Sequence, residues 1–176
     1  MPNVVPVTDS RGAVINAELL ADAEAVHRQL RPQIPPDYVG RMKEILAGGA
    51  EMAVATVNGQ VAGITVFRIL EKTFTGRELY CDDLVTDERR RSTGVGHALI
   101  AYMEGVVRER GCTAFTLDSG TQREQAHKFY FREGMTVTAF HFTMKKTSGG
   151  AANGPSGRSS ERTPGRRSTT RSRSSK

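Results

Sequence analysis

Arg91-Ser92-Thr93-Gly94-Val95-Gly96 links a strand-like run, Tyr80 to Thr86, to a helical pattern. The helix is predicted by apolar residues at the spacing of a single helical face: Val95, Leu99, Tyr102, Met103 and Val106. Gly94 and Gly96 therefore lie in its first turn, where unpaired N–H groups and the positive end of the helix dipole favour an anion. Because glycine places no side chain between these donors and a ligand, the stretch predicts a site for a phosphate-bearing molecule.

Three glycine-rich phosphate sites can be compared with this stretch. A P-loop needs a Gly-Lys pair, and the chain contains none. The dinucleotide-binding fingerprint fits weakly, because Leu99 stands where its third glycine is needed and no βαβ unit precedes it. The third pattern, Arg/Gln-x-x-Gly-x-Gly/Ala after a strand, is matched by Arg91, Gly94 and Gly96.

A second motif lies downstream, where residues 126–135 read Ala-His-Lys-Phe-Tyr-Phe-Arg-Glu-Gly-Met. Together the two motifs resemble the GNAT superfamily of N-acetyltransferases, which has an Ala-x-x-Phe-Tyr-x-x-x-Gly-Phe block at this place. Within it the chain loosely resembles the subgroup of small-molecule amine and aminoalkylphosphonate acetyltransferases. It departs from the family pattern at Ser92, where a glycine is common, and at Arg123, where many members have asparagine.

The resemblance implies an α/β (α+β) fold with a central mixed, mostly antiparallel sheet of six to seven strands flanked by about four helices. A parallel pair of strands would be splayed at the site of acetyl-CoA, the expected cosubstrate. Backbone groups of Leu84, Val85 and Thr86 would pair with the pantetheine arm. The pyrophosphate would lie on the loop formed by Arg91, Ser92, Thr93, Gly94, Val95 and Gly96.

The resemblance also suggests catalytic residues. Tyr130 stands where many family members place the phenol that protonates the thiolate of coenzyme A, and the less favoured alternative is a core aromatic beside Phe129. The acceptor ammonium needs a base, for which Asp82, then Asp83, are the candidates, with Glu78 and Asp118 in reserve. Successive strand residues face opposite sides, so Asp82 and Asp83 share a face only if a bulge intervenes. Either carboxylate can instead be solvated or salt-bridged.

The predicted function is transfer of an acetyl group from acetyl-CoA to the primary amine of a small molecule by direct attack in a ternary complex. A protein or peptide N-acetyltransferase and a non-catalytic acyl-CoA-binding module remain alternatives. A covalent route through Cys81 or Cys112 is less favoured than two buried thiols. No metal is expected, because the four histidines lack metal-ligand spacing. A homodimer is a further possibility implied by the family.

The remaining elements follow from local patterns. Asn58-Gly59 predicts a hairpin between strands at Met52–Val57 and Gln60–Leu70. Other expected elements are a strand at Val4–Thr8, helices at Asn16–Leu30, Tyr38–Leu46 and 122–133, a strand at Cys112–Ser119 parallel to its neighbour, and a final strand at Met135–Lys146.

Charge divides the chain into two parts. Residues 147–176 carry seven basic side chains and one acidic one, which accounts for the entire net charge of +6 of the 176-residue chain. This Ser/Gly/Arg-rich tail is predicted to be disordered, with a weak possibility of binding an anionic partner. Residues 1–146 are expected to form one acetyltransferase domain. With no signal peptide at Met1 and no apolar run of about 18 residues, a cytoplasmic protein without a membrane span is expected.

Overall fold

The computed structural model describes residues 1–144, of which Met1–His141 form one compact unit. The predicted tail at 147–176 lies outside the described residues. The elements of the compact unit, in order, are β1 (Asn3–Pro6), α1 (Ala17–Asp22), α2 (Glu24–Leu30), α3 (Tyr38–Ala47), β2 (Ala50–Val57), β3 (Gln60–Lys72), β4 (Gly76–Thr86), the short 3₁₀ helix η1 (Glu88–Arg90), α4 (Val95–Glu109), β5 (Ala114–Leu117) and α5 (Glu124–Arg132).

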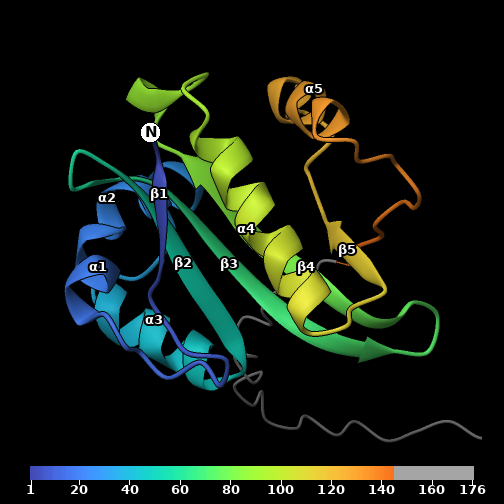
Figure 1. Ribbon diagram of the computed structural model, residues 1–176, viewed down its shortest axis with the longest axis horizontal. Helices are drawn as coiled ribbons and strands as arrows, with labels where there is room; N and C mark the ends of the chain where they lie inside the picture. The colour runs from blue at the N-terminus through green and yellow to red at the C-terminus, as the bar shows by residue number, and fades with distance from the viewer. Residues whose placement is uncertain (145–176) are drawn as a thin grey trace, which may run out of the picture. The chain divides into compact units, whose positions relative to one another are not determined.

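The five strands form one sheet in the order β1-β2-β3-β4-β5 (Figure 1). All neighbours are antiparallel except β4 and β5, which are parallel. The predicted hairpin is confirmed, because Val57 pairs with Gln60 across Asn58-Gly59. Both turn residues have positive φ, 52° and 76°, which asparagine and glycine tolerate best.

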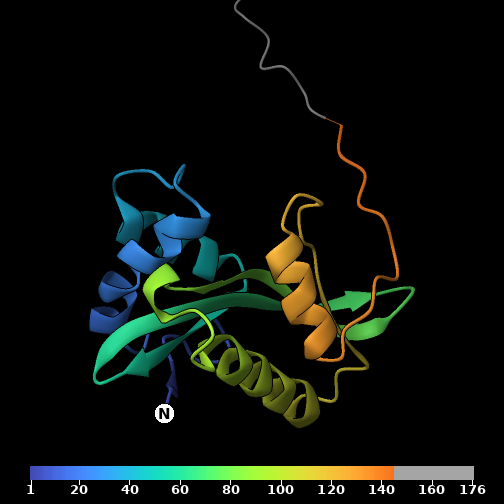
Figure 2. The same cartoon turned by 90° about the horizontal axis from the view of Figure 1, so that it is seen from above.

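Helices cover both faces of the sheet, with α1–α3 on one side and α4 on the other (Figure 2). The α4 face is packed by four residues of the predicted apolar stripe, Val95, Leu99, Met103 and Val106, all of which are buried. Tyr102, the fifth predicted residue, is only half-buried, and Ile100, which was not predicted, is buried with the others. The opposite face holds a second core, in which Leu20, Val26, Tyr38, Met42 and Leu46 pack against β2 and β3. This arrangement fixes the start of α4 beside the end of β4.

A bulge interrupts β4 at the two adjacent aspartates. Asp83 pairs with Val66 and Cys81 with Phe67, so Asp82 is an extra residue in the β4 ladder. The bulge shifts the alternation of the strand by one position. Below it, Cys81 faces α4; above it, Leu84 faces α4 and Val85 faces the core under α1–α3. The bulge therefore turns Asp82 and Asp83 to the same face of the sheet.

The structure corrects three sequence predictions. Within residues 1–144 the sheet has five strands rather than six or seven, and residues 16–30 form two short helices instead of one. No strand is present in residues 135–144, where Val137 and Phe140 are exposed. An alternating pattern forms a strand only when a neighbour supplies hydrogen bonds and a face to bury it. β5 has only four residues and offers a short edge for such pairing.

None of the helices within residues 1–144 is long and apolar enough to cross a membrane.

Candidate active site

The first turn of α4 has the geometry of an anion site. Its N-cap is Gly94, which has a left-handed backbone (φ 86°, ψ 0°) and supplies no side-chain cap to the helix. The first intrahelical hydrogen bond is donated by the N–H of Ala98 to Gly94 O at 2.9 Å. The N–H groups before Ala98 are therefore left for a ligand. A Cβ at Gly94 would have no neighbour within 4 Å, so the glycine is required by backbone conformation rather than by space.

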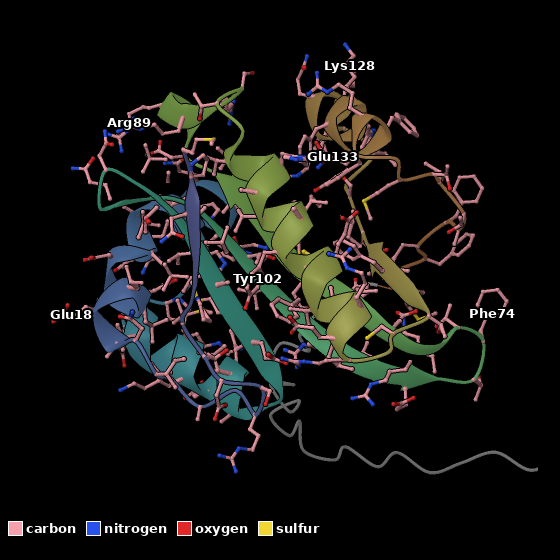
Figure 3. The ribbon with its side chains drawn as sticks, in the orientation of Figure 1. Glu18, Phe74, Arg89, Tyr102, Lys128 and Glu133 are labelled. Carbon is pink, nitrogen blue, oxygen red and sulfur yellow. The ribbon has the colours of Figure 1, made fainter. Side chains whose placement is uncertain are left out.

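Gly96 has a packing role that the sequence analysis did not predict. A Cβ at this position would lie 3.0 Å from Phe129 Cζ, so the missing side chain lets α5 pack against the start of α4. A second contact joins the same helices, because His97 Nδ1 lies 2.8 Å from Glu133 Oε2 at the end of α5. Glu133 lies on the side of α5 that faces α4 (Figure 3). This hydrogen bond, and then the charge of Glu133, raise the pKa of His97.

Ser92 adopts φ 62°, the left-handed region in which glycine is favoured. Ser92, which replaces the common glycine of the motif, therefore adopts a backbone conformation that is unfavourable for a residue with a side chain. Thr93 Oγ1 donates to Arg90 O at 2.6 Å and closes the loop. Arg91 is exposed next to it.

The strand that leads to this loop has an open edge. β4 and β5 pair only from Glu78–Ala114 to Cys81–Leu117, whereas β4 continues to Thr86. Beyond Cys81 the two parallel strands therefore part, and the β5 side of Leu84, Val85 and Thr86 has no strand partner in the described residues. Free backbone donors and acceptors along such an edge can pair with an extended ligand.

Each bulge aspartate is held by an arginine. Asp82 Oδ2 accepts from Arg68 Nε at 2.7 Å, and Arg68 also donates to Gly48 O at 3.0 Å. Asp83 Oδ1 accepts from Arg31 Nε at 2.6 Å. The structure thus brings both predicted residues to one face, and it places each in an ion pair.

Sequence reasoning missed His27 and Tyr38, which complete the surroundings of Asp83. His27 Nε2 lies 2.9 Å from Asp83 Oδ2, and His27 Nδ1 lies 3.1 Å from the Tyr38 hydroxyl. Both residues are buried, with exposures of 1%. Asp83 is therefore held from two sides, by His27 of α2 and by Arg31, the residue directly after that helix. The only sequence signal was a histidine inside an amphipathic helix, which more often marks the core.

Tyr130 lies on α5, half-buried beside Phe129 at a ring-centroid distance of 5.5 Å. Its hydroxyl has no hydrogen-bond partner within residues 1–144. Burial, and to a smaller extent the charge of a Cys81 thiolate, raise the pKa of Tyr130 to about 12. The phenol is therefore a proton donor over the whole physiological range, placed close to the point where β4 and β5 part.

This arrangement agrees with comparisons to known proteins. Residues 17–135, more than half of the chain, match the sequence model of the Acetyltransferase (GNAT) family. The chain belongs to the GNAT acetyltransferase family. This membership confirms the predicted enzyme class, an acetyl-CoA-dependent N-acetyltransferase.

Two curated relatives resemble this GNAT protein. It is 38% identical over 68 residues to the uncharacterized N-acetyltransferase YhdJ of Bacillus subtilis (strain 168), a match that covers 38% of this chain and 48% of that protein. It is 28% identical over 108 residues to the aminoalkylphosphonate N-acetyltransferase of Salmonella typhimurium (strain LT2), covering 59% of this chain and 68% of that protein. The matched region thus spans about half the length of the Bacillus relative.

Solved structures share the GNAT fold at low sequence identity. The ribosomal-protein-alanine N-acetyltransferase of Brucella melitensis biovar Abortus 2308 is 16% identical, with a TM-score of 0.69 over 84% of this chain and 100% of that one. The aminoglycoside 6'-N-acetyltransferase AAC(6')-Ih of Acinetobacter baumannii is 17% identical, also with a TM-score of 0.69, over 85% and 100% of the two chains.

Cys81 of the GNAT protein does not have the surroundings of a nucleophile, and Cys112 is partly exposed rather than buried as predicted. Cys81 is 3% exposed on the α4 face of β4, and burial raises its pKa to about 12. Thr65 Oγ1 at 3.6 Å is a weak partner for its sulfur. Because the thiolate is the reactive form, only a very small fraction of Cys81 could attack at neutral pH.

We therefore expect a Cys81→Ala variant to keep kcat within about threefold of wild type, since other residues supply the chemistry. Mass spectrometry of protein incubated with acetyl-CoA should find no acetyl group on Cys81. Cys112→Ala is the matched control for loss of a thiol. Stoichiometric acetylation of Cys81, or loss of turnover in the Cys81→Ala variant alone, would support the covalent route.

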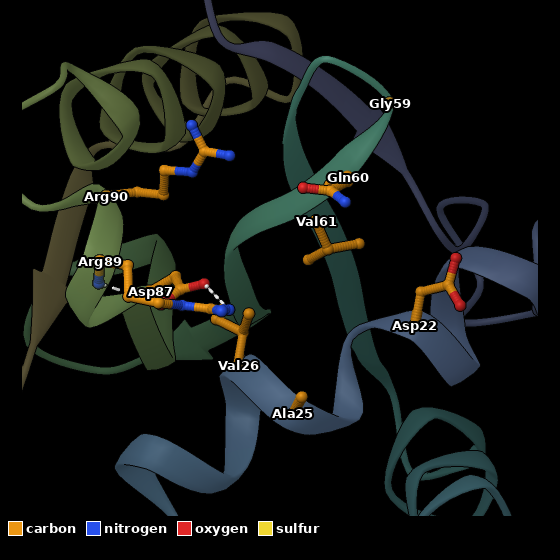
Figure 4. Close-up of a pocket in the computed structure, with 9 residues that line it drawn as sticks. All are labelled: Asp22, Ala25, Val26, Gly59, Gln60, Val61, Asp87, Arg89 and Arg90. Atoms are coloured by element: carbon orange, nitrogen blue, oxygen red, sulfur yellow. Dashed lines mark hydrogen bonds and ion pairs between the residues drawn. The ribbon is translucent and has the colours of Figure 1, made fainter.

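A hollow of about 590 Å³ lies between α1, α2, the β2–β3 turn and η1 (Figure 4). Its lining is Asp22, Ala25, Val26, Gly59, Gln60, Val61, Asp87, Arg89 and Arg90. Arg89 points to Asp87 and holds the pKa of that buried carboxyl at about 2. None of the predicted catalytic or phosphate-loop residues lines the hollow, so we do not assign acetyl transfer to it.

Two further observations bear on ligands. Ser119 Oγ, just after β5, is buried without a hydrogen-bond partner within residues 1–144. Such a hydroxyl is costly unless a ligand or water completes it. No group of three or more His, Cys, Asp or Glu side chains in the described part of the chain could hold a metal ion.

Proposed function

We propose that this protein transfers the acetyl group of acetyl-CoA to the primary amine of a small molecule, by direct attack in a ternary complex. The observation that carries the proposal is the uncapped first turn of α4 beside the unpaired edge of β4. The first turn of α4 suits a diphosphate, and the unpaired edge of β4 suits an extended chain with amide groups. The pantetheine arm of coenzyme A is such a chain.

The residues around this edge fit the donor. The loop from Arg91 to Gly96 would hold the pyrophosphate through backbone N–H groups, with the exposed Arg91 guanidinium nearby. Leu84, Val85 and Thr86 would pair with the pantetheine amides. The buried hydroxyl of Ser119 lacks a hydrogen-bond partner, and an amide group of acetyl-CoA would supply one. Acetyl-CoA supplies the electrophilic thioester carbonyl and a thiolate leaving group.

Tyr130 is the proposed acid for the departing thiolate. It is the phenol of the second motif, it is protonated at neutral pH, and its hydroxyl has no other partner among the described residues. Asp82 and Asp83 are better suited to shape the acceptor side than to take a proton. Each already forms an ion pair with an arginine, Asp82 with Arg68 and Asp83 with Arg31, so its carboxylate oxygens are engaged by the protein.

Sequence relatives favour a small acceptor. The Salmonella relative acts, by its name, on aminoalkylphosphonates, and it matches 59% of this chain. The aminoglycoside acetyltransferase AAC(6')-Iy, 18% identical with a TM-score of 0.69, binds a bisubstrate analogue that joins coenzyme A to acetylneamine. That likeness adds only the fold, so the acceptor assignment depends on the sequence relative.

The test is thiol release from acetyl-CoA across a panel of alkyl amines, aminoalkylphosphonates, aminoglycosides and peptides. We expect turnover on free small amines and heat of binding with acetyl-CoA in calorimetry. Turnover confined to peptides would replace this proposal with a protein acetyltransferase. Binding of acetyl-CoA without turnover on any acceptor would indicate a non-catalytic module.

A further inference from the structure

Four carboxylates, three on β4 and one directly after β5, lie near the place where the strands part, and they differ in their partners. Glu78 is buried and paired with Lys72, while Asp82 and Asp83 are paired with Arg68 and Arg31. Asp118 is the exception. Its Oδ2 accepts from the Tyr80 hydroxyl at 2.7 Å and lies 2.8 Å from His141 Nδ1. No lysine or arginine in residues 1–144 pairs with it.

The position of Asp118 relates it to the acceptor side of the site. It directly follows Leu117, the last β5 residue paired with β4, whose partner is Cys81. Asp118 therefore lies level with the bulge at Asp82. Leu117 packs on the α4 face of the sheet. By strand alternation Asp118 belongs to the opposite face, which it shares with Tyr80 and the bulge aspartates.

The hydrogen bonds fix how His141 is presented. With Nδ1 donating to the Asp118 carboxylate, the lone pair of the neutral ring is on Nε2. The His141 side chain is 66% exposed, so Nε2 is accessible to a ligand. Burial, and then the hydrogen bond to Asp118, raise the pKa of Tyr80, which therefore remains a donor to Asp118. Lys72 Nζ lies 5.2 Å from the centre of the Tyr80 ring and is already bound to Glu78.

We propose that His141 is the general base that deprotonates the acceptor ammonium, and that Asp118 is a positioning residue that orients its imidazole. This inference rests on the proposed function. Histidine is the side chain that changes charge between pH 5 and 8, which suits a base at neutral pH better than an arginine-paired carboxylate.

The ammonium gives one proton to His141 Nε2, and the exposed imidazolium passes it to solvent. The neutral nitrogen then forms its bond to the acetyl carbon as the carbon–sulfur bond breaks. The thiolate takes a proton from Tyr130, and the phenolate is restored by the remaining extra proton of the new amide nitrogen. One amine cation thus yields one amide, one thiol and one released proton.

The first test is His141→Asn, whose side-chain amide can still donate to Asp118 but cannot act as a base. We expect kcat/KM for an alkyl amine to fall about 10²-fold at pH 7, at the lower end of the effects of general bases. The loss should shrink as pH rises toward the amine pKa of about 10, because more acceptor is already neutral. The Kd for acetyl-CoA should stay unchanged.

The second test is Asp118→Asn, which keeps the shape of the side chain but can present its amide to Nδ1. We expect a loss of kcat/KM of about tenfold or more, with the acidic limb of the pH profile displaced, a change that a merely structural role would not cause. Glu44→Gln is the matched control, because Glu44 is an exposed carboxylate paired with Arg41 on α3, outside the site. It should retain wild-type values.

The outcomes separate the two claims. Wild-type protein that acetylates amines while His141→Asn does so equally well, with the same pH profile, overturns the assignment of His141 and leaves the proposed function intact. Wild-type protein that acetylates no amine overturns the proposed function, and the assignment with it. Imidazole NMR signals of His141 that shift with added alkyl amine in wild type, and not in Asp118→Asn, are the expected result independent of turnover.

Discussion

Tyr130→Phe is expected to lower kcat by about 10²-fold, with a change of less than about threefold in KM for acetyl-CoA. The variant keeps the ring that packs beside Phe129 and removes only the hydroxyl. Without that proton donor, the thiolate must leave unprotonated or take its proton from water. Steady-state kinetics at saturating amine measure the effect directly.

The size of this effect follows from the surroundings of the phenol. Burial raises the pKa of Tyr130 to about 12, whereas a thiol has a pKa of about 8.5. A difference of about 3.5 pKa units corresponds to roughly 5 kcal/mol against complete proton transfer, so we place the loss at the low end of the range for general acids. Since the phenol stays protonated below pH of about 11, Tyr130 should cause no alkaline decline in kcat below that point.

Tyr102→Phe is the matched control. Tyr102 is half-buried on α4, where it packs edge-on to Phe67 at 6.4 Å, away from the site. The control should keep wild-type kcat. If Tyr130→Phe also keeps it, the acid role is wrong, and Tyr130 is a core aromatic.

Gly63→Ala is expected to destabilise the fold by about 1–3 kcal/mol, and to weaken acetyl-CoA binding about tenfold or more. Gly63 lies in β3 directly beneath the start of α4. A Cβ there would be 2.6 Å from Val95 Cγ1 and 3.1 Å from Leu99 Cδ1, far inside contact distance. The first turn of α4 must move away, and its N–H groups move with it. Urea denaturation and calorimetry with acetyl-CoA measure the two effects.

Gly105→Ala provides the opposite result in the same helix. A Cβ at Gly105 would meet nothing within 4 Å, and alanine is favoured over glycine in a helix interior by about 1 kcal/mol. We expect this variant to be more stable than wild type, with unchanged affinity for acetyl-CoA. Equal affinity in Gly63→Ala and Gly105→Ala would show that the position of the first turn does not determine donor binding.

Several parts of the fold and site were accessible from sequence because their causes are local. Asn58-Gly59 specifies a hairpin through its own positive φ values, and the α4 stripe is a periodicity within 15 residues. Gly94 was predicted in the first helical turn, although its conformation as the N-cap was not. For Gly96, local reasoning gave the residue without its packing role, because Phe129 approaches from another helix.

The site chemistry was less accessible for the same reason. Asp82 and Asp83 could be named as carboxylates on a central strand, but their arginines come from β3 and from the C-cap of α2. Asp118 was only a reserve, because nothing in its neighbours reveals that Tyr80 and His141 converge on it. The prediction of a final strand was wrong, because the alternating pattern is present but no neighbouring strand pairs with it.

By itself, the sequence determined where the chain turns, which helix carries the phosphate loop and which family the motifs resemble, since backbone conformation and periodicity are set by adjacent residues. Only the tertiary structure decided that a bulge turns two aspartates to one face, that each is neutralised by an arginine, and that an aspartate–histidine pair is left without a permanent cation. Those features depend on contacts between residues far apart in the chain, such as Arg31 and Asp83, which the packing of α2 on the sheet brings together. The interaction energy of two charges is set by the distance between them in space and not by their separation in sequence.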